Sequence, residues 1–79
     1  THNDGEVKFI RQDLADAIDS LPDDLRITFE LNAAGFKYHE IADKLNIPIG
    51  TVKTRIFVAR RKLRVQLQDY AKHYGLQAS

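Results

Sequence analysis

Residues 38–63 read YHEIADKLNIPIGTVKTRIFVARRKL, and the rest of the chain is organised around them. Apolar residues recur in the first part at the three- and four-residue spacing that lines one helix face, at Tyr38, Ile41, Ala42 and Leu45. Asn46 follows directly, and asparagine tolerates the left-handed conformation that often ends a helix. Pro48 disfavours helical backbone at the residue before it, so the chain has to turn. We therefore predict a helix over about 38–45 that ends in a tight turn.

A second helix is predicted after the turn, from about residue 49 to about residue 74. Its apolar residues follow one another at spacings of four, three, four and four, which defines one narrow face: Val52, Ile56, Ala59, Leu63 and Leu67. Two helices joined by such a turn are typical of a helix-turn-helix. We place this motif at residues 38–63.

The side of the second helix that lies opposite the apolar face is basic. At 3.6 residues per turn, Lys53, Phe57 and Arg61 lie at about 100°, 140° and 180° from the start of the apolar face. Six Lys or Arg and no acidic residue occur between Pro48 and Arg64. Solvated helix faces usually mix both signs, whereas a DNA-recognition helix combines a buried apolar stripe with a basic outer face. This pattern favours DNA binding.

Two helices are predicted before the motif, over about 5–19 and about 22–34, because apolar residues recur there at helical spacing. Ser20 is well placed to cap the second of them, with Pro22 in its first turn, and Gly35 ends it. The predicted fold is therefore all-α: a small four-helix domain containing a helix-turn-helix, in which the last helix is the longest.

The length and composition agree with a single small domain over residues 1–79. The sequence has no cysteine, which excludes disulfides, thiolate metal sites and a thiol nucleophile. It has no pair of acids in a catalytic arrangement, no Ser–His–Asp set and no phosphate-binding loop, so we expect no catalysis and no cofactor. No apolar run approaches a membrane span or a signal-peptide core. We expect a cytoplasmic protein without membrane insertion.

The net charge of +1 conceals a strong asymmetry along the chain. Residues 1–34 carry eight acidic against three basic residues, and residues 35–79 carry nine basic against three acidic. Such an asymmetry suggests that one part of the domain faces a polyanion and another part faces away from it. The small overall charge predicts weak DNA binding by the isolated domain.

The sequence resembles region 4 of bacterial sigma factors, most closely the extracytoplasmic-function group, over about residues 14–67. The matching segments are Ser20-Leu21-Pro22 with Arg26, Phe29 with Leu31, Glu40-Ile41-Ala42, Pro48 with Gly50 to Arg55, and Ala59-Arg60 with Leu63-Arg64. LuxR-type output domains of response regulators share the Glu-Ile-Ala and Thr-Val-Lys segments. The leading Leu-Pro and the trailing Ala-Arg-x-x-Leu-Arg favour the sigma factor.

This resemblance implies a promoter-recognition domain of an alternative sigma factor. Such a domain binds the −35 element of double-stranded promoter DNA in the major groove and docks on the β flap of RNA polymerase core to direct transcription initiation. An anti-sigma factor is a further expected partner, and the domain is expected to be a monomer.

The DNA-binding residues follow from the same resemblance together with the basic face. Base-reading positions are Lys53, Thr54, Phe57 and Val58, and Thr51, Arg55 and Arg60 lie nearer the phosphates. Arg61 and Arg64 complete the set. Phe57 has two possible roles. It either contacts a thymine methyl or a base edge, or it is a partly packed surface residue.

Two residues depart from the family pattern. Val58 stands where relatives often carry arginine, so one phosphate or guanine contact is absent and the preferred DNA sequence stays open. Lys37 stands where a serine usually caps the first helix of the motif. Losing that cap costs about 0.5–2 kcal/mol unless another group satisfies the free amides.

Two other functions remain open. A LuxR-type output domain would dimerise through its last helix, so a monomer in solution would argue against it. A helical module that binds an acidic protein, such as an anti-sigma factor, would not bind labelled DNA duplexes at any salt concentration.

Overall fold

The computed structural model describes residues 12–73, with the side chains of residues 12–68. This part of the chain forms four helices and no strands, which confirms the predicted all-α class. The helices cover residues 12–19, α2 (Asp23–Ala33), α3 (Tyr38–Leu45) and α4 (Ile49–His73). The predicted stretches 5–11 and 74 lie outside the described residues. The predicted bounds agree with the observed ones to within one residue elsewhere.

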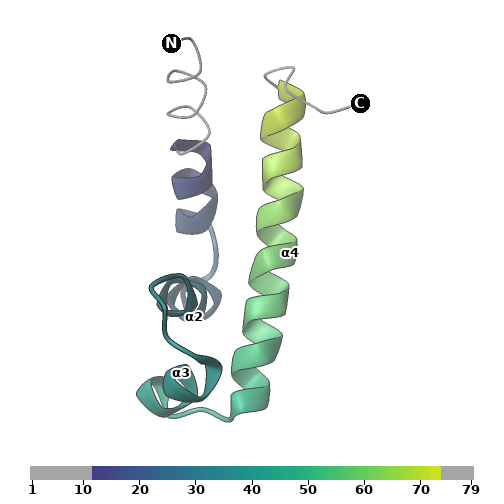
Figure 1. Ribbon diagram of the computed structural model, residues 1–79. Helices are drawn as coiled ribbons and strands as arrows, with labels where there is room; N and C mark the ends of the chain where they lie inside the picture. The colour runs from purple at the N-terminus through teal and green to yellow at the C-terminus, as the bar shows by residue number, and fades with distance from the viewer. Residues whose placement is uncertain (1–11, 74–79) are drawn as a thin grey trace.

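The four helices are arranged along α4, the longest of them (Figure 1). The helix over residues 12–19 runs beside the upper half of α4, and α2 is seen nearly end-on, so it crosses α4. The short α3 lies at the lower end, beside the first turns of α4 and in contact with it. Both halves of the domain are therefore joined through one continuous helix.

The core consists of two clusters of buried side chains, and α4 contributes to both. The upper cluster contains Ala17, Leu21, Leu25, Ala59 and Leu63. The lower cluster contains Ile41, Ala42, Val52 and Ile56. Four of the five residues of the predicted apolar face of α4 are thus buried, and the fifth, Leu67, is half-buried. The prediction of which face of α4 points inward is confirmed.

The turn of the motif forms as the sequence predicts. Asn46 adopts the left-handed conformation, with φ 56° and ψ 49°. The Ile47 amide donates to the Ala42 carbonyl oxygen at 3.0 Å, and the Asn46 amide donates to that of Asp43 at 3.3 Å. These two bonds satisfy carbonyl groups that the end of α3 would otherwise leave free. Backbone bonds therefore end α3 at the predicted position, and the chain turns there toward α4.

The predicted cap of α2 is wrong. The cap position is occupied by Pro22, and no side chain bonds to the free amides from that position. The Oγ of Ser20 instead lies 2.7 Å from the Ala17 carbonyl oxygen and 2.9 Å from Oε1 of Gln66. The Ser20 hydroxyl therefore lies against the end of the helix over residues 12–19 and against α4, and not at the start of α2.

The start of α3 shows how the chain compensates for Lys37. The Lys37 backbone amide donates to Oε1 of Glu40 at 2.7 Å. This bond is one half of a capping box. The other half cannot form, because an ammonium group donates hydrogen bonds and has no lone pair to accept one. Part of the missing cap is thus replaced, and an amide of the first turn still lacks a side-chain acceptor from the cap position.

Replacing Lys37 with serine should therefore stabilise the domain. The new hydroxyl would accept from a free amide of the first turn of α3, which is worth about 0.5–2 kcal/mol in the free energy of unfolding. Urea unfolding followed by circular dichroism measures this difference. Lys37→Ala is the matched control, because it removes the same charge without adding an acceptor. Equal stability of the two variants would show that the bond from Glu40 already suffices.

Candidate nucleic-acid interface

The part of α4 that points away from the core carries six exposed side chains, which we call the outward face. They are Lys53, Thr54, Phe57, Arg60, Arg61 and Arg64. Their exposure follows from the helical period, because the buried residues of α4 occupy the opposite side. All six belong to the predicted DNA-binding set. The helix therefore brings two thirds of that set together on one surface.

Phe57 is the most unusual member of the outward face. Its side chain is 62% exposed, although a large apolar ring normally gains free energy by burial. Among the described residues it joins neither of the two core clusters. A packing role within this domain therefore does not account for an aromatic residue at this position.

The cations of the outward face have no carboxylate partner among the side chains that the structure describes. Among the side chains of residues 12–68, no carboxylate lies within 4.0 Å of the charged groups of Lys53, Arg60, Arg61 or Arg64. Arg26 on α2 differs, because Asp23 and Glu30 each lie 3.3 Å from its guanidinium nitrogens. Uncompensated cations on one surface attract a polyanion and raise its local concentration.

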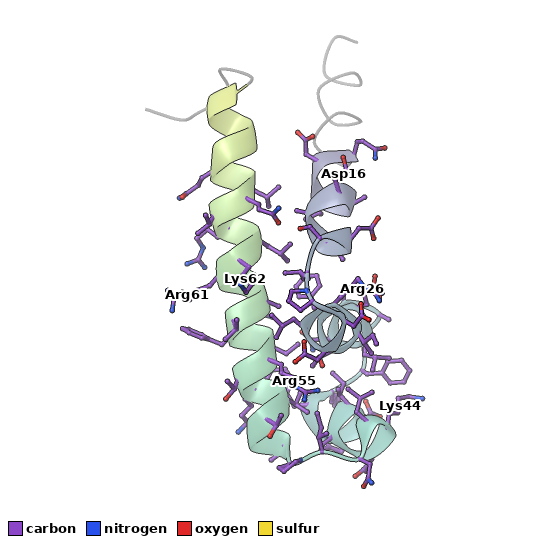
Figure 2. The ribbon with its side chains drawn as sticks, turned by 180° about the vertical axis from the view of Figure 1, so that it is seen from behind. Asp16, Arg26, Lys44, Arg55, Arg61 and Lys62 are labelled. Carbon is purple, nitrogen blue, oxygen red and sulfur yellow. The ribbon has the colours of Figure 1, made fainter. Side chains whose placement is uncertain are left out.

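Three predicted site residues lie off the outward face. Val58 is half-buried and packs against the upper cluster, and Thr51 is half-buried near the start of α4. The Arg55 side chain is 28% exposed, and its Nε lies 4.0 Å from Oδ2 of Asp24. Figure 2 shows Arg55 between α4 and α2, whereas Arg61 extends from α4 away from α2. A DNA contact by these three residues stays a prediction.

An open groove of about 620 Å³ was not predicted from the sequence. It lies between α4 and the chain segment that joins the helix over residues 12–19 to α2. Its lining residues are Ser20, Leu21, Pro22, Val58, Arg61, Lys62, Val65 and Gln66. Val65 is 58% exposed there, and two cations stand beside the apolar side chains. The spacing of Val58 and Val65 by two helical turns was the signal available in the sequence.

Two features are absent from the described residues. None of their helices is long and apolar enough to cross a membrane. Their His, Cys, Asp and Glu side chains form no group of three that could hold a metal ion.

The fold and the outward face define the class of this protein as a helix-turn-helix domain. The sequence model of the family described as Sigma-70, region 4 matches residues 11–63, and the chain belongs to this family. It is 42% identical over 60 residues to the ECF RNA polymerase sigma-E factors of Escherichia coli (strain K12) and Salmonella typhimurium (strain LT2). It is 39% identical over 54 residues to the ECF RNA polymerase sigma-E factor of Haemophilus influenzae.

These alignments cover 75% and 67% of this chain and 31% and 29% of the relatives. The chain thus spans about three tenths of the length of the curated relatives it matches. The resemblance to region 4 of the extracytoplasmic-function group is confirmed.

Proposed function

We propose that this domain recognises promoter DNA for an alternative sigma factor, with α4 lying in the major groove of the −35 element. The observation that carries the proposal is the outward face, because it places uncompensated cations and an exposed aromatic ring on the second helix of a helix-turn-helix. Membership of the Sigma-70 region 4 family supports the same function. The domain would act by binding, without catalysis.

The order of residues along α4 supports a division between base and phosphate contacts. Lys53 and Phe57 lie one turn apart, offset by only about 40° around the helix, so both can enter the same groove. The N-terminal residues of a recognition helix are those that usually reach base edges. Arg60 lies nearer α2, at the edge of the outward face, where a phosphate backbone would pass.

The groove supports a second contact, which we propose is made with the flap of the RNA polymerase β subunit. Val58, Lys62 and Val65 line it at about 240°, 280° and 220° around α4 from Val52, whereas the outward face extends from about 80° to about 200°. Promoter DNA and polymerase could therefore bind adjacent surfaces of one monomeric domain at the same time. An anti-sigma factor would compete for these surfaces in the cytoplasm.

The salt dependence of DNA binding tests this function. Duplexes selected from a random pool on the domain should bind with log K falling by about 0.9 per phosphate neutralised as log salt concentration rises. Arg60→Ala should lower that slope by roughly one unit and weaken all duplexes alike. Fluorescence anisotropy of labelled duplexes at several salt concentrations measures both quantities.

Lys62→Ala is the matched control. It removes one cation from the same helix, but this cation lines the groove and is not part of the outward face. The slope should then stay at the parental value. A DNA affinity that does not change with salt would contradict the proposal. An equal decrease of slope in both variants would show that DNA lies across the groove as well.

A further inference from the structure

Asn32 occupies a fixed position at the end of α2. Gly35, with φ 109°, donates its backbone amide to the Asn32 carbonyl oxygen at 3.0 Å. The Phe36 amide donates to the Leu31 carbonyl oxygen at 3.1 Å. Together these bonds form the two-bond termination that glycine permits at a helix end. The backbone on both sides of Asn32 is therefore held by hydrogen bonds.

The side chain of Asn32 joins two other parts of the fold. Its Nδ2 donates to the Phe36 carbonyl oxygen at 3.2 Å, and its Oδ1 accepts from Nη2 of Arg60 at 3.5 Å. Only this orientation of the amide satisfies both partners, because a carbonyl requires a donor and a guanidinium requires an acceptor. Phe36 packs against the lower cluster, so the amide is anchored to the core.

We propose that Asn32 is a positioning residue for DNA binding, which holds the Arg60 guanidinium at the edge of the outward face where a phosphate would be bound. This inference rests on the proposed function. A guanidinium carries five N–H donors, and the contact with Asn32 uses one of them. The other donors stay available to a phosphate, and an arginine that is already ordered loses less rotamer entropy on binding.

The neutral charge of Asn32 is what suits it to this role. Arg55 lies on the other flank of α4 and faces the carboxylate of Asp24, which compensates its charge. An amide oxygen orients Arg60 without compensating its charge, so the attraction to a phosphate is kept. The N-terminal end of α2 thus compensates the charge of Arg55, whereas its C-terminal end orients Arg60 and leaves its charge uncompensated.

The test compares Asn32→Ala in the parent and in the Arg60→Ala background, with the selected duplex and a scrambled duplex of equal length as probes. In the parent, Asn32→Ala should lower the affinity for both duplexes by about 2- to 10-fold, because the Arg60 side chain would then have to be ordered on binding. The salt slope should not change, because Arg60 still reaches its phosphate. In the Arg60→Ala background the same change should have no further effect.

Asn32→Asp provides the matched variant. Alanine and aspartate both remove the donor to Phe36, but aspartate keeps an acceptor for Arg60 and adds a negative charge. Asn32→Asp should therefore lower the salt slope in the parent by up to about one unit and leave it unchanged in the Arg60→Ala background. Circular dichroism at the assay temperature verifies that each variant is folded.

The outcomes separate this inference from the proposed function. An equal loss of affinity from Asn32→Ala in both backgrounds would mean a purely structural role and would overturn the inference. Parental affinity of Asn32→Ala would overturn it too. No effect of Arg60→Ala, with DNA binding by the parent intact, would also overturn the inference, because Arg60 would not contact a phosphate. Absence of DNA binding by the parent would instead contradict the proposed function.

Discussion

Replacing Ile56 with alanine should lower the free energy of unfolding by about 2–5 kcal/mol, because it leaves a cavity in a packed core. The Ile56 side chain is 1% exposed and belongs to the lower cluster, where it packs with Ile41 and Val52 of the two motif helices. A domain of this size has a total stability near the lower end of about 5–15 kcal/mol. The variant should therefore be partly unfolded at roughly 37 °C. Urea and thermal unfolding followed by circular dichroism would measure this.

Leu63→Ala should have a similar effect through the upper cluster, where Leu63 is 5% exposed. Val65→Ala is the control on the same helix, since Val65 is 58% exposed and its truncation should change stability by no more than about 0.5 kcal/mol. If Ile56→Ala or Leu63→Ala unfolded at the same temperature as the parent, α4 would not hold the two clusters together.

The second large effect concerns how the DNA sequence is read. The Lys53 ammonium can donate to O6 and N7 of guanine, and such a contact discriminates between bases by about 1–3 kcal/mol. Lys53→Ala and Phe57→Ala should therefore flatten the preference at particular base pairs while leaving non-specific binding largely intact. Arg60→Ala should weaken every duplex and keep the preferences. A mismatch scan of the selected duplex with the three variants measures this difference.

Lys62→Ala would serve as a reference for the scan, because Lys62 lines the groove and lies outside the predicted DNA-binding set. If Lys53→Ala weakened all duplexes equally, Lys53 would contact a phosphate, and α4 would be rotated in the groove relative to our proposal. If Phe57→Ala changed no preference, its exposed ring would belong to a different interface.

The features of the fold that the sequence predicted correctly are local ones. The inward face of α4 follows from the spacing of Val52, Ile56, Ala59 and Leu63, because the period of a helix is fixed by its backbone. The left-handed Asn46 and the helix end at Gly35 follow from conformational preferences of single residues. The exposure of Lys53 and Phe57 follows from the same period and needed no tertiary information.

The features that the sequence did not predict depend on which segments meet in space. Ser20 has the chemistry of a helix cap, but Gln66, forty-six residues away, lies within reach of its hydroxyl. The position of Asp24 beside Arg55 depends on the direction in which α2 crosses α4. Angles around a single helix cannot supply that direction.

The positions of the predicted DNA-binding residues were anticipated in part. Six of the nine residues in the predicted set lie on the outward face, while Val58 packs against the upper cluster because the helix over residues 12–19 and α2 approach α4 on that side. The groove was missed because its walls come from segments far apart in the chain. Pairs such as Asn32 and Arg60 are likewise visible only once the fold is known.

Arg61 belongs both to the outward face and to the lining of the groove. If the outward face binds DNA and the groove binds a partner, as proposed, this one guanidinium links the occupancies of the two surfaces thermodynamically. If a partner in the groove changes the affinity of the domain for DNA by some factor, DNA must change the affinity for that partner by the same factor. The sign of this coupling depends on whether Arg61 can satisfy both ligands or has to leave one for the other. If both proposed contacts are made, Arg61 would decide whether promoter DNA and polymerase assist or oppose each other on this domain.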